Sequence, residues 1–223
     1  MKEFLTADQH IFVADFAAGE NDEVPYFFHN ILSSCLGLNR EISITVYCTD
    51  LHTLRIESLF DKLYEQKLLG NTRVVLTKFE SMIDNATFPE VQVEQLAETS
   101  VDRTFIDETV LTKNVIPKSC FDIGILNNDV IGYIHEYYKE YTDASRSIEG
   151  IKQVMKESSL LIVTQPCLLY PIDNIQVLEQ FGFQFVEGFD IEILSGEITL
   201  IDSTTDHRTM SRLNHYTFLI FKL

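Results

Sequence analysis

The sequence predicts an α/β fold in which a mainly parallel sheet carries helices on both faces. Strand-like apolar runs alternate five times with stretches of helical periodicity, and alternating β–α units place successive strands parallel to one another. Two later strand-like runs have no helical stretch between them, so they are expected to be antiparallel to each other. The 223 residues are enough for one core of this kind.

The N-terminal third of the chain contains three of these units. Strands are expected at 10–16, 41–50 and 71–79. Helices are expected between them, at 22–38 and 51–70. Apolar residues recur every three or four positions in both helical stretches, and Pro25 suits the first turn of the earlier one. Gly70 marks the end of the later one.

The pattern lapses between residues 80 and 118, where the sequence is acidic and mixed. A structureless loop of this length is unusual in a compact domain, so this segment is expected to form an insertion or lid. Strands follow at 121–129, 159–166, 184–194 and 215–223, with helices at 130–158 and 172–183. No Pro/Gly-rich linker interrupts the chain, so residues 1–223 are expected to form a single domain.

The charge balance is strongly acidic. Thirty-four Asp and Glu residues against 17 Lys and Arg residues give a net charge of −17. A nucleic-acid binder needs a basic face, and the sequence has no cluster of even three basic residues. Direct nucleic-acid binding is therefore not expected without a basic partner, and a small molecule or a protein segment fits better. The alternative interpretation is that the charge only keeps the protein soluble.

The composition also bears on location. No apolar run reaches the roughly 20 residues of a membrane span, and the N-terminus does not have the pattern of a signal peptide. The four cysteines are widely spaced, which is typical of reduced thiols in a cytosolic or nuclear protein. We expect a cytoplasmic protein, with the nucleus as the alternative; the oligomeric state is left open.

The turn after the first strand is the first candidate for a binding site. Asp15 closes the strand, and Ala17, Ala18 and Gly19 precede the next helix. Small residues let a ligand approach the main chain, and glycine adopts positive φ without strain. In an open α/β sheet, ligands bind beyond the carboxyl ends of the strands. An ordinary βα loop also favours small residues, so this motif alone leaves both interpretations open.

A second acid follows at the end of the second strand. Asp50 closes TVYCTD, about thirty residues after the turn, where a carboxylate accepts hydrogen bonds from the ribose of a nucleoside cofactor. The alternative is that Asp50 caps the helix that starts near Leu51. The combination of strand, small-residue turn, helix, strand and acid is a stronger signal than either acid alone.

These motifs resemble those of the class I S-adenosylmethionine-dependent methyltransferases, and the resemblance extends from about residue 10 to residue 223. VADFAAGEND resembles their first motif, TVYCTD their second, and FGFQFVEG with HYTFLIFKL their late strand pair. The resemblance implies a seven-stranded Rossmann-like sheet of order 3-2-1-4-5-7-6 with an antiparallel C-terminal strand. It implies S-adenosyl-L-methionine as the cofactor and methyl transfer as the reaction.

The resemblance also assigns cofactor-binding residues. Asp15 would complement the cationic cofactor, Asp50 would hold the ribose, and Phe79 and Glu80 would contact the adenine. The full set that it implies is Asp15, Ala17, Gly19, Asp50, Leu51, Phe79, Glu80, Asn127 and Asn128. One position departs from the usual D-x-G-x-G pattern, since Ala17 stands where the family has its first glycine.

Residues after the fourth strand are the candidates for catalysis. Asp129, Tyr133 and His135 follow that strand, and His135 would act as a general base if the acceptor carries a proton at neutral pH. The Asn127-Asn128-Asp129 stretch is not the Asn-Pro-Pro-Tyr motif of amino methylation on nucleobases. The methyl acceptor is therefore expected to be a small molecule or a protein.

The sequence also bears on four alternative functions. The histidines and cysteines lack metal-ligand spacing, and no G-x-S-x-G elbow of a hydrolase occurs. A nicotinamide-dependent oxidoreductase is disfavoured because G-x-G-x-x-G is absent. A methyltransferase-like scaffold or regulatory subunit without activity remains the main alternative, because Ala17 and the acidic charge both allow it.

Overall fold

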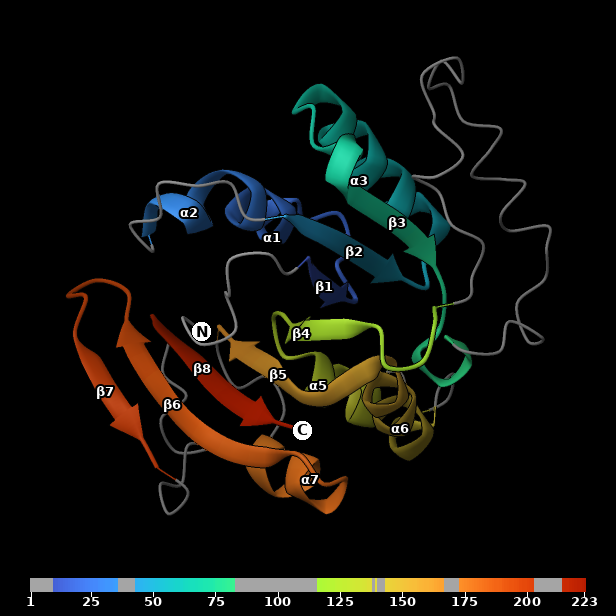
Figure 1. The fold of residues 1–223 in the computed structure, drawn as a ribbon. Helices are drawn as coiled ribbons and strands as arrows, with labels where there is room; N and C mark the ends of the chain where they lie inside the picture. The colour runs from blue at the N-terminus through green and yellow to red at the C-terminus, as the bar shows by residue number, and fades with distance from the viewer. Residues whose placement is uncertain are drawn as a thin grey trace. The chain divides into compact units, whose positions relative to one another are not determined.

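The structure is a computed structural model of the chain. It describes residues 10–35, 43–82, 116–137, 139, 143–166, 173–202 and 214–223. The expected insertion at 80–118 thus lies mostly outside the described residues. The chain divides into two compact units, residues 1–116 and residues 117–223, and each is described by itself (Figure 1).

The first unit is a three-stranded parallel sheet with helices. Its strands are β1 (Ile11–Phe16), β2 (Ile44–Asp50) and β3 (Thr72–Leu76). Their order is β3-β2-β1, with β2 pairing in parallel with both neighbours. The helix α3 (Thr53–Glu65) packs on β2 and β3. Short 3₁₀ turns follow at η3 (Leu69–Asn71) and η4 (Phe79–Ser81).

The helical segment after β1 has an unusual centre. It consists of α1 (Glu23–Tyr26), the π-helical η2 (Phe27–Ile31) and α2 (Leu32–Cys35). Pro25 lies in the first turn, as predicted, and is buried together with Val24. The π-helical segment has no local signal in the sequence. Such segments are rare and recur at functional sites.

The second unit is a five-stranded mixed sheet. Its strands are β4 (Phe121–Leu126), β5 (Met155–Gln165), β6 (Gln184–Glu192), β7 (Ile198–Ile201) and β8 (His215–Lys222). Their order is β4-β5-β8-β6-β7. β4 and β5 are parallel, whereas β8 runs antiparallel to both β5 and β6. The late strand pair is therefore antiparallel, as predicted.

Four helical segments accompany this sheet. They are α5 (Val130–Gly132), the π-helical η7 (Tyr133–Tyr137), α6 (Ala144–Val154) and α7 (Asn174–Gln180). α6 packs on β5, and α7 packs on β6. Asp143 and Asp173 cap α6 and α7 by accepting hydrogen bonds from the backbone amides of Arg146 and Gln176, each at 3.0 Å.

Two sequence-based boundaries were wrong. Residues 155–158 were expected to end a helix, but they begin β5, because Met155 is already extended and pairs with Phe121. The polar stretch after residue 194 was expected to hold no strand, but it contains β7. A turn at Glu192–Glu197, with Gly196 at φ +72°, reverses the chain so that Ile198 pairs with Ile191.

The fold class is the predicted one. The described residues form mixed α/β structure with mainly parallel strands and antiparallel strands at the C-terminus, and they hold eight strands rather than the predicted seven. The partial orders in the two units match the predicted order 3-2-1 and 4-5-7-6, with β8 in the place of the predicted seventh strand. β7 is an additional strand beside β6.

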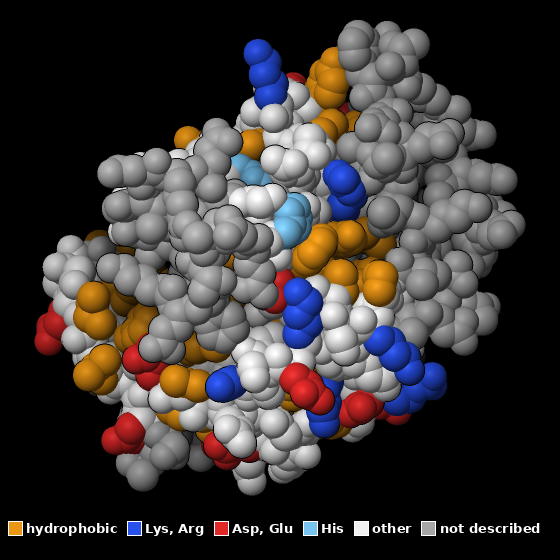
Figure 2. Space-filling view, in the orientation of Figure 1, with side chains coloured by type: hydrophobic (Ala, Val, Ile, Leu, Met, Phe, Trp, Pro, Cys, Tyr) orange, Lys and Arg blue, Asp and Glu red, His pale blue; other side chains and the backbone are white. Residues whose placement is uncertain are grey.

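The core of each unit is mainly apolar, although each unit also buries aspartate side chains. Phe16, Leu59 and Leu63 are fully buried in the first unit, as are Phe121, Phe183 and Phe221 in the second. On the face drawn in Figure 2, acidic and basic side chains are interspersed. Among the described residues, no helix is long and apolar enough to span a membrane.

Candidate functional site

The turn after β1 contains two residues in the left-handed region. Ala17 has φ +57° and Gly19 has φ +62°. The turn is fixed by backbone hydrogen bonds, since the amide of Ala18 donates to the carbonyl of Thr49 (2.8 Å) and the amide of Asn21 to the carbonyl of Ala18 (3.1 Å). A Cβ built on Gly19 meets no atom within 4 Å. The space beside Gly19 is therefore open in the described structure.

Ala17 carries backbone strain that a glycine would not. An L-residue in the left-handed region costs about 1–2 kcal/mol, and glycine occupies it freely. Ala17 stands where the D-x-G-x-G pattern has its first glycine. The turn thus adopts positive φ at a position where the sequence does not favour it.

Asp15 is the most unusual ionisable group of this unit. It is 1% exposed, and its Oδ1 atom has no hydrogen-bond partner among the described residues. Burial raises its pKa well above the ordinary value, and the nearby charges of Asp50 and Glu23 raise it further. A buried carboxylate without a partner is costly. A cation beside Asp15 would remove that cost.

Asp50 joins the turn to the end of β2. Its Oδ2 accepts a hydrogen bond from the amide of Gly19 (3.0 Å), and its Oδ1 accepts one from the amide of His52 (2.8 Å). The helix α3 begins only at Thr53, and the N-cap position is His52, so Asp50 is not the N-cap residue. Each carboxylate oxygen can accept a second hydrogen bond, although Asp50 is only 5% exposed.

Two side chains of α3 and that of its C-cap residue hold the outer part of the turn. Ser58 donates to a carboxylate oxygen of Glu20 (3.1 Å), and Lys62 donates to the carbonyl of Glu20 (2.7 Å). Gln66 donates to the carboxylate of Asp22. These residues recur every four positions, so they lie on one face of the helix. The turn is therefore anchored to β2 on one side and to α3 on the other.

The predicted adenine contacts, Phe79 and Glu80, follow β3, and the predicted cofactor residue Leu51 follows β2. Phe79 follows β3 and packs edge-on against Phe16, with ring centroids 6.0 Å apart. Phe79, Glu80 and Leu51 are half-buried. The first unit thus brings together the predicted residues Asp15, Ala17, Gly19, Asp50 and Leu51, and it holds Phe79 next to the strand that carries Asp15.

A polar network lies at the carboxyl ends of β4 and β5 in the second unit. The hydroxyl of Thr164 donates to Oδ1 of Asn127 (2.5 Å), and the hydroxyl of Tyr216 also donates to that atom (2.9 Å). The amide of Asn128 donates to the hydroxyl of Thr164 (3.1 Å). Because two hydroxyls occupy Oδ1 of Asn127, a ligand would meet its side chain mainly as an N–H donor.

Asp129 is built into the start of α5. It is fully buried with φ +60°, and its Oδ1 accepts hydrogen bonds from the amide of Gly132 (3.3 Å) and from Nε2 of Gln165 (3.2 Å). The bond from Gly132 makes Asp129 the N-cap of α5. Its predicted catalytic role stays a prediction, and a direct contact with an acceptor would need access that the buried side chain does not offer.

Tyr133 and His135 lie on the π-helical segment η7. The ring of Tyr133 meets that of Tyr137 edge-on, with centroids 6.0 Å apart. His135 is half-buried; its Nε2 is buried and has no hydrogen-bond partner. Burial lowers the pKa of His135, so the imidazole is neutral at neutral pH. Its role as a general base also stays a prediction.

The sequence reasoning missed Thr164, Gln165 and Tyr216, which support the turn after β4. Thr164 and Gln165 could have been noticed, because they are polar residues that close an apolar strand. Tyr216 had no local signal, since it lies in β8 about ninety residues after Asn127 and meets it only through the fold. Among the described residues, no group of three or more His, Cys, Asp or Glu side chains is arranged to hold a metal ion.

Comparisons with known proteins identify the fold rather than a family. No protein-family model matches the sequence. The comparison with curated proteins likewise finds no match. Solved structures, in contrast, match over almost the whole chain. The structure is similar to that of a SAM-dependent methyltransferase from Aquifex aeolicus, with a TM-score of 0.55 and 12% identity over 99% of this chain and 86% of that one.

Two further solved structures widen the comparison. A TehB-like SAM-dependent methyltransferase from Corynebacterium glutamicum matches with a TM-score of 0.52 and 12% identity, over 96% of this chain and 81% of that one. The [4+2]-cyclase SpnF matches equally well, with a TM-score of 0.52 and 11% identity over 96% and 76% of the two chains. The chain therefore has the fold of SAM-dependent methyltransferases, and this fold also occurs in a protein described as a cyclase.

Proposed function

We propose that this chain binds S-adenosyl-L-methionine through the turn after β1 and transfers its methyl group to a small-molecule or protein acceptor. The fold supports the general reaction class, because solved SAM-dependent methyltransferases share it. At 12% identity this likeness concerns the fold alone. The proposal therefore depends on the chemistry of the turn itself.

The observation that carries the proposal is the buried carboxylate of Asp15. Its Oδ1 lacks a partner, and its pKa is raised by burial. S-adenosylmethionine carries two positive charges, on its sulfonium and on its amino group. A cation beside Asp15 would satisfy the carboxylate and favour its ionised form. The open space beside Gly19 and the left-handed turn at Ala17 suit a ligand lying against the main chain.

The nucleoside would be held by residues of the same unit. Asp50 already accepts one hydrogen bond on each oxygen, and the remaining lone pairs would accept from the ribose hydroxyls. Phe79 and Leu51 are half-buried and would contact the adenine ring. Glu80 would accept a hydrogen bond from the adenine amino group. Bound in this way, the cofactor supplies an electrophilic methyl group on a sulfonium.

The second unit offers a polar surface of its own, at the residues Asn127 and Asn128 that the resemblance assigns to the cofactor. Asn127 would present its amide N–H groups to a ligand, since its oxygen is held by Thr164 and Tyr216. Methyl transfer is an in-line displacement, so positioning and exclusion of water account for much of its rate. The acidic charge of the chain argues against a nucleic-acid acceptor.

A second candidate function is a scaffold without methyltransferase activity. Ala17 favours it, because a side chain at the first glycine position brings strain and a methyl group to the turn. The similarity to a [4+2]-cyclase also shows that this fold serves proteins named for another reaction. Cofactor binding separates the two candidates.

The direct test is ligand binding to the full chain. Calorimetry and thermal shift with S-adenosylmethionine and S-adenosylhomocysteine should show binding, and a ligand at 100 times its Kd stabilises the fold by about 2.7 kcal/mol. Asp50→Ala should weaken binding by about 1–3 kcal/mol if the carboxylate holds the ribose. Asp61→Asn, on the exposed side of α3, is the matched control and should bind like the wild type.

Two results would count against the proposal. Absence of any shift at millimolar ligand would favour the scaffold. Unchanged affinity in Asp50→Ala would restrict Asp50 to the role that its contacts with Gly19 and His52 already describe.

A further inference from the structure

β7 is the outermost strand of the sheet in the second unit, and the proposed methyl transfer does not use it. Among the described strands its neighbour is β6, with which it pairs from Ile198 to Ile201. Figure 1 draws β7 on the outer side of β6. An edge strand presents backbone N–H and C=O groups that can pair with another chain. The exposed edge of β7 is therefore a possible interaction surface.

The hydrogen bonds of the preceding turn show which backbone groups of β7 face outward. The amide of Glu192 donates to the carbonyl of Glu197 (2.9 Å), and residue pairs along an antiparallel ladder alternate between hydrogen-bonded and non-hydrogen-bonded. The pair that contains Thr199 is therefore hydrogen-bonded to β6. The backbone groups of Ile198 and Leu200 face away from β6, and no residue in the described ranges hydrogen-bonds to them. These groups can pair with an added strand.

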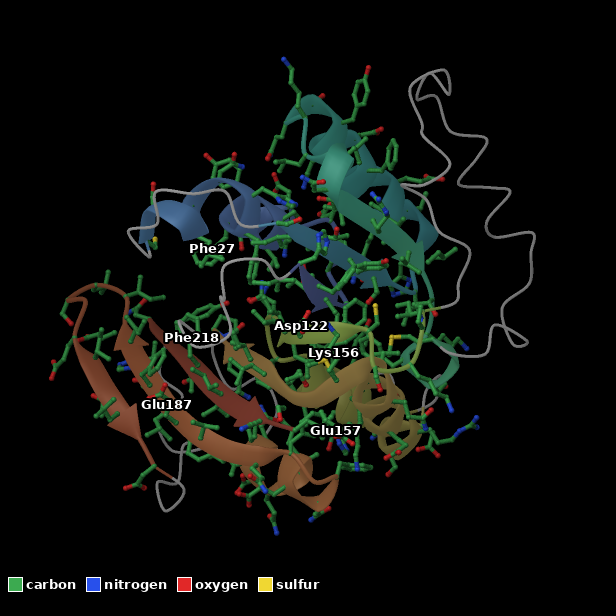
Figure 3. The ribbon with its side chains drawn as sticks, in the orientation of Figure 1. Phe27, Asp122, Lys156, Glu157, Glu187 and Phe218 are labelled. Carbon is green, nitrogen blue, oxygen red and sulfur yellow. The ribbon has the colours of Figure 1, made fainter. Side chains whose placement is uncertain are left out.

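The same two residues expose apolar side chains. Ile198 is 62% exposed and Leu200 is 76% exposed. They lie opposite Ile191 and Phe189 of β6, which are half-buried, and residues directly opposite each other share one face of a sheet. The ring of Phe218 in β8 (Figure 3) extends this face, with its centroid 5.7 Å from that of Phe189. An apolar surface thus lies beside the outward backbone groups.

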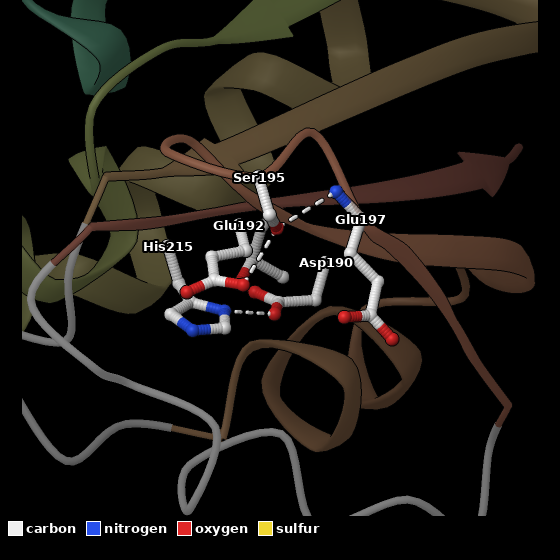
Figure 4. A network of polar contacts seen from close by, with 6 residues as sticks. Asp190, Glu192, Ser195, Glu197 and His215 are labelled. Carbon is white, nitrogen blue, oxygen red and sulfur yellow. Dashed lines mark hydrogen bonds and ion pairs between the residues drawn. The ribbon is translucent and has the colours of Figure 1, made fainter.

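The hairpin formed by β6 and β7 is fixed by polar contacts. At its turn the hydroxyl of Ser195 donates to the carboxylate of Glu192 (2.6 Å) and accepts from the amide of Glu197 (3.1 Å) (Figure 4). Asp190 of β6 is hydrogen-bonded to His215 at the start of β8. Because these contacts already order the hairpin, little conformational entropy of β7 is lost when another strand pairs with it.

The charge around this edge has one sign. Residues 184–202 contain no Lys or Arg, and their acids are Glu187, Asp190, Glu192, Glu197 and Asp202. Glu197 directly precedes β7 and Asp202 directly follows it, and both are exposed. Figure 2 shows hydrophobic and acidic side chains together on the part of the surface where β7 lies. Carboxylates at both ends of the strand attract a basic segment and oppose a second copy of the same hairpin.

We propose that β7 binds an extended strand of a partner protein in which apolar residues alternate with Lys or Arg. The partner strand pairs with the outward backbone groups of Ile198 and Leu200 and places its apolar side chains beside theirs. Its basic side chains lie near Glu197 and Asp202. A second copy of this chain is the less favourable occupant, because it brings the same acidic charge. The proposal does not depend on methyl transfer.

The first test measures peptide binding to the full chain by fluorescence anisotropy. The labelled peptide Lys-Val-Lys-Ile-Lys-Val-Lys should bind saturably. Its analogue N-methylated at the Val and Ile residues keeps the charge and the side chains but loses the amides that face β7, so it should bind about tenfold more weakly or worse. The peptide with Glu in place of Lys should be weaker still. Equal affinity of the N-methylated peptide would overturn the proposal, since charge alone would then explain the binding.

The second test places a charge on the edge. Leu200→Lys should weaken binding of the basic peptide about tenfold or more. Leu54→Lys, on α3, is the matched control, because it changes an equally exposed leucine (79%) and the net charge by the same amount, and it should bind like the wild type. Leu200→Pro removes an outward N–H without interrupting the ladder to β6 and should also weaken binding.

Two outcomes of this test would contradict the proposal. One is an equal loss of affinity in Leu200→Lys and Leu54→Lys. The other is a wild type that forms a dimer in sedimentation experiments and becomes monomeric in Leu200→Lys, because a second copy would then cover the edge.

The third test locates the bound peptide by amide hydrogen exchange, measured by NMR. In the chain without peptide, the outward amides of Ile198 and Leu200 should exchange faster than that of Thr199, which faces β6. Saturating basic peptide should slow exchange at Ile198 and Leu200 about tenfold or more and leave Thr199 nearly unchanged. Binding without added protection at Ile198 and Leu200 would place the peptide elsewhere and refute the proposal.

Discussion

The two units share a local plan and use its acidic residue differently. In each, a buried strand leads through left-handed residues into a helical segment with a π-helical part: β1 to η2 in the first unit and β4 to η7 in the second. The acid of the first turn, Asp15, is buried with an unpartnered Oδ1. The acid of the second, Asp129, accepts hydrogen bonds from Gly132 and Gln165. The acid of the second turn thus stabilises its own fold, whereas the proposed function assigns the acid of the first turn to the cofactor.

The largest effect on stability is expected from a substitution in the second of these turns. Asp129→Ala removes two hydrogen bonds, leaves buried donors without partners and places alanine at φ +60°. We expect a loss of about 3 kcal/mol in the free energy of unfolding, measured by chemical denaturation. Asp143→Ala, at the exposed N-cap of α6, is the control and should cost about 1 kcal/mol. Equal losses in the two variants would contradict a special role for the buried cap.

The next effect concerns the first turn. Asp15→Asn should lower the affinity for S-adenosylmethionine by about ten- to a hundredfold, because a charge-assisted contact is lost. Without ligand, the variant should be more stable than the wild type at neutral pH, by about 1 kcal/mol, because no buried charge remains. A variant that binds as tightly as the wild type would refute the contact between Asp15 and the cofactor.

The pH dependence of stability tests the same carboxyl group. Because the pKa of Asp15 is raised in the folded state, the native chain binds more protons than the unfolded chain above about pH 3.8. The contribution of Asp15 to stability is therefore present below that pH and is lost as the pH rises through the folded-state pKa. Asp15→Asn should lack this loss in parallel denaturation series. An identical pH dependence of stability in the wild type and in Asp15→Asn would contradict this role of Asp15.

A smaller effect on stability is expected from substitutions of the left-handed residues in the two turns. Ala17→Gly relieves strain and should stabilise the chain by about 0.5–1 kcal/mol, after the entropy cost of glycine. Asn128→Gly should instead destabilise it by about 1 kcal/mol, since asparagine tolerates positive φ and its Oδ1 accepts from the hydroxyl of Tyr216 (3.2 Å). Denaturation experiments should show changes of opposite sign in the free energy of unfolding of the two variants. Changes of the same sign would contradict the comparison.

The smallest effect involves the histidines of the two π-helical segments. Burial lowers the pKa of both His29 and His135, so the folded chain binds fewer protons than the unfolded one just below pH 6.5. Their contribution to stability is present above that pH and is lost as the pH falls. The variants His29→Gln and His135→Gln should each flatten the decline between pH 6.5 and the lowered values. A decline that stays equally steep would show that other groups cause it.

Local sequence patterns determined most of the architecture. The alternation of β-branched and amphipathic stretches predicted the strands β1 to β6 and β8 and the mainly parallel arrangement, because burial of one face requires these periods. The local sequence also showed the acids at the ends of β1 and β2, Asp15 and Asp50, and the small residues that follow β1. β7 was missed because its short strand lies in a polar stretch and is formed by pairing with β6.

The tertiary structure alone decided which polar side chains contact one another. Asp50 reaches Gly19, Tyr216 reaches Asn127, and Asp190 reaches His215 over separations of 25 to 89 residues. No periodicity encodes such contacts, since they arise where strand order brings distant strand ends to one edge of the sheet. The sequence determined which residues carry charge and which segments are buried, whereas the fold decided which donors each buried carboxylate meets.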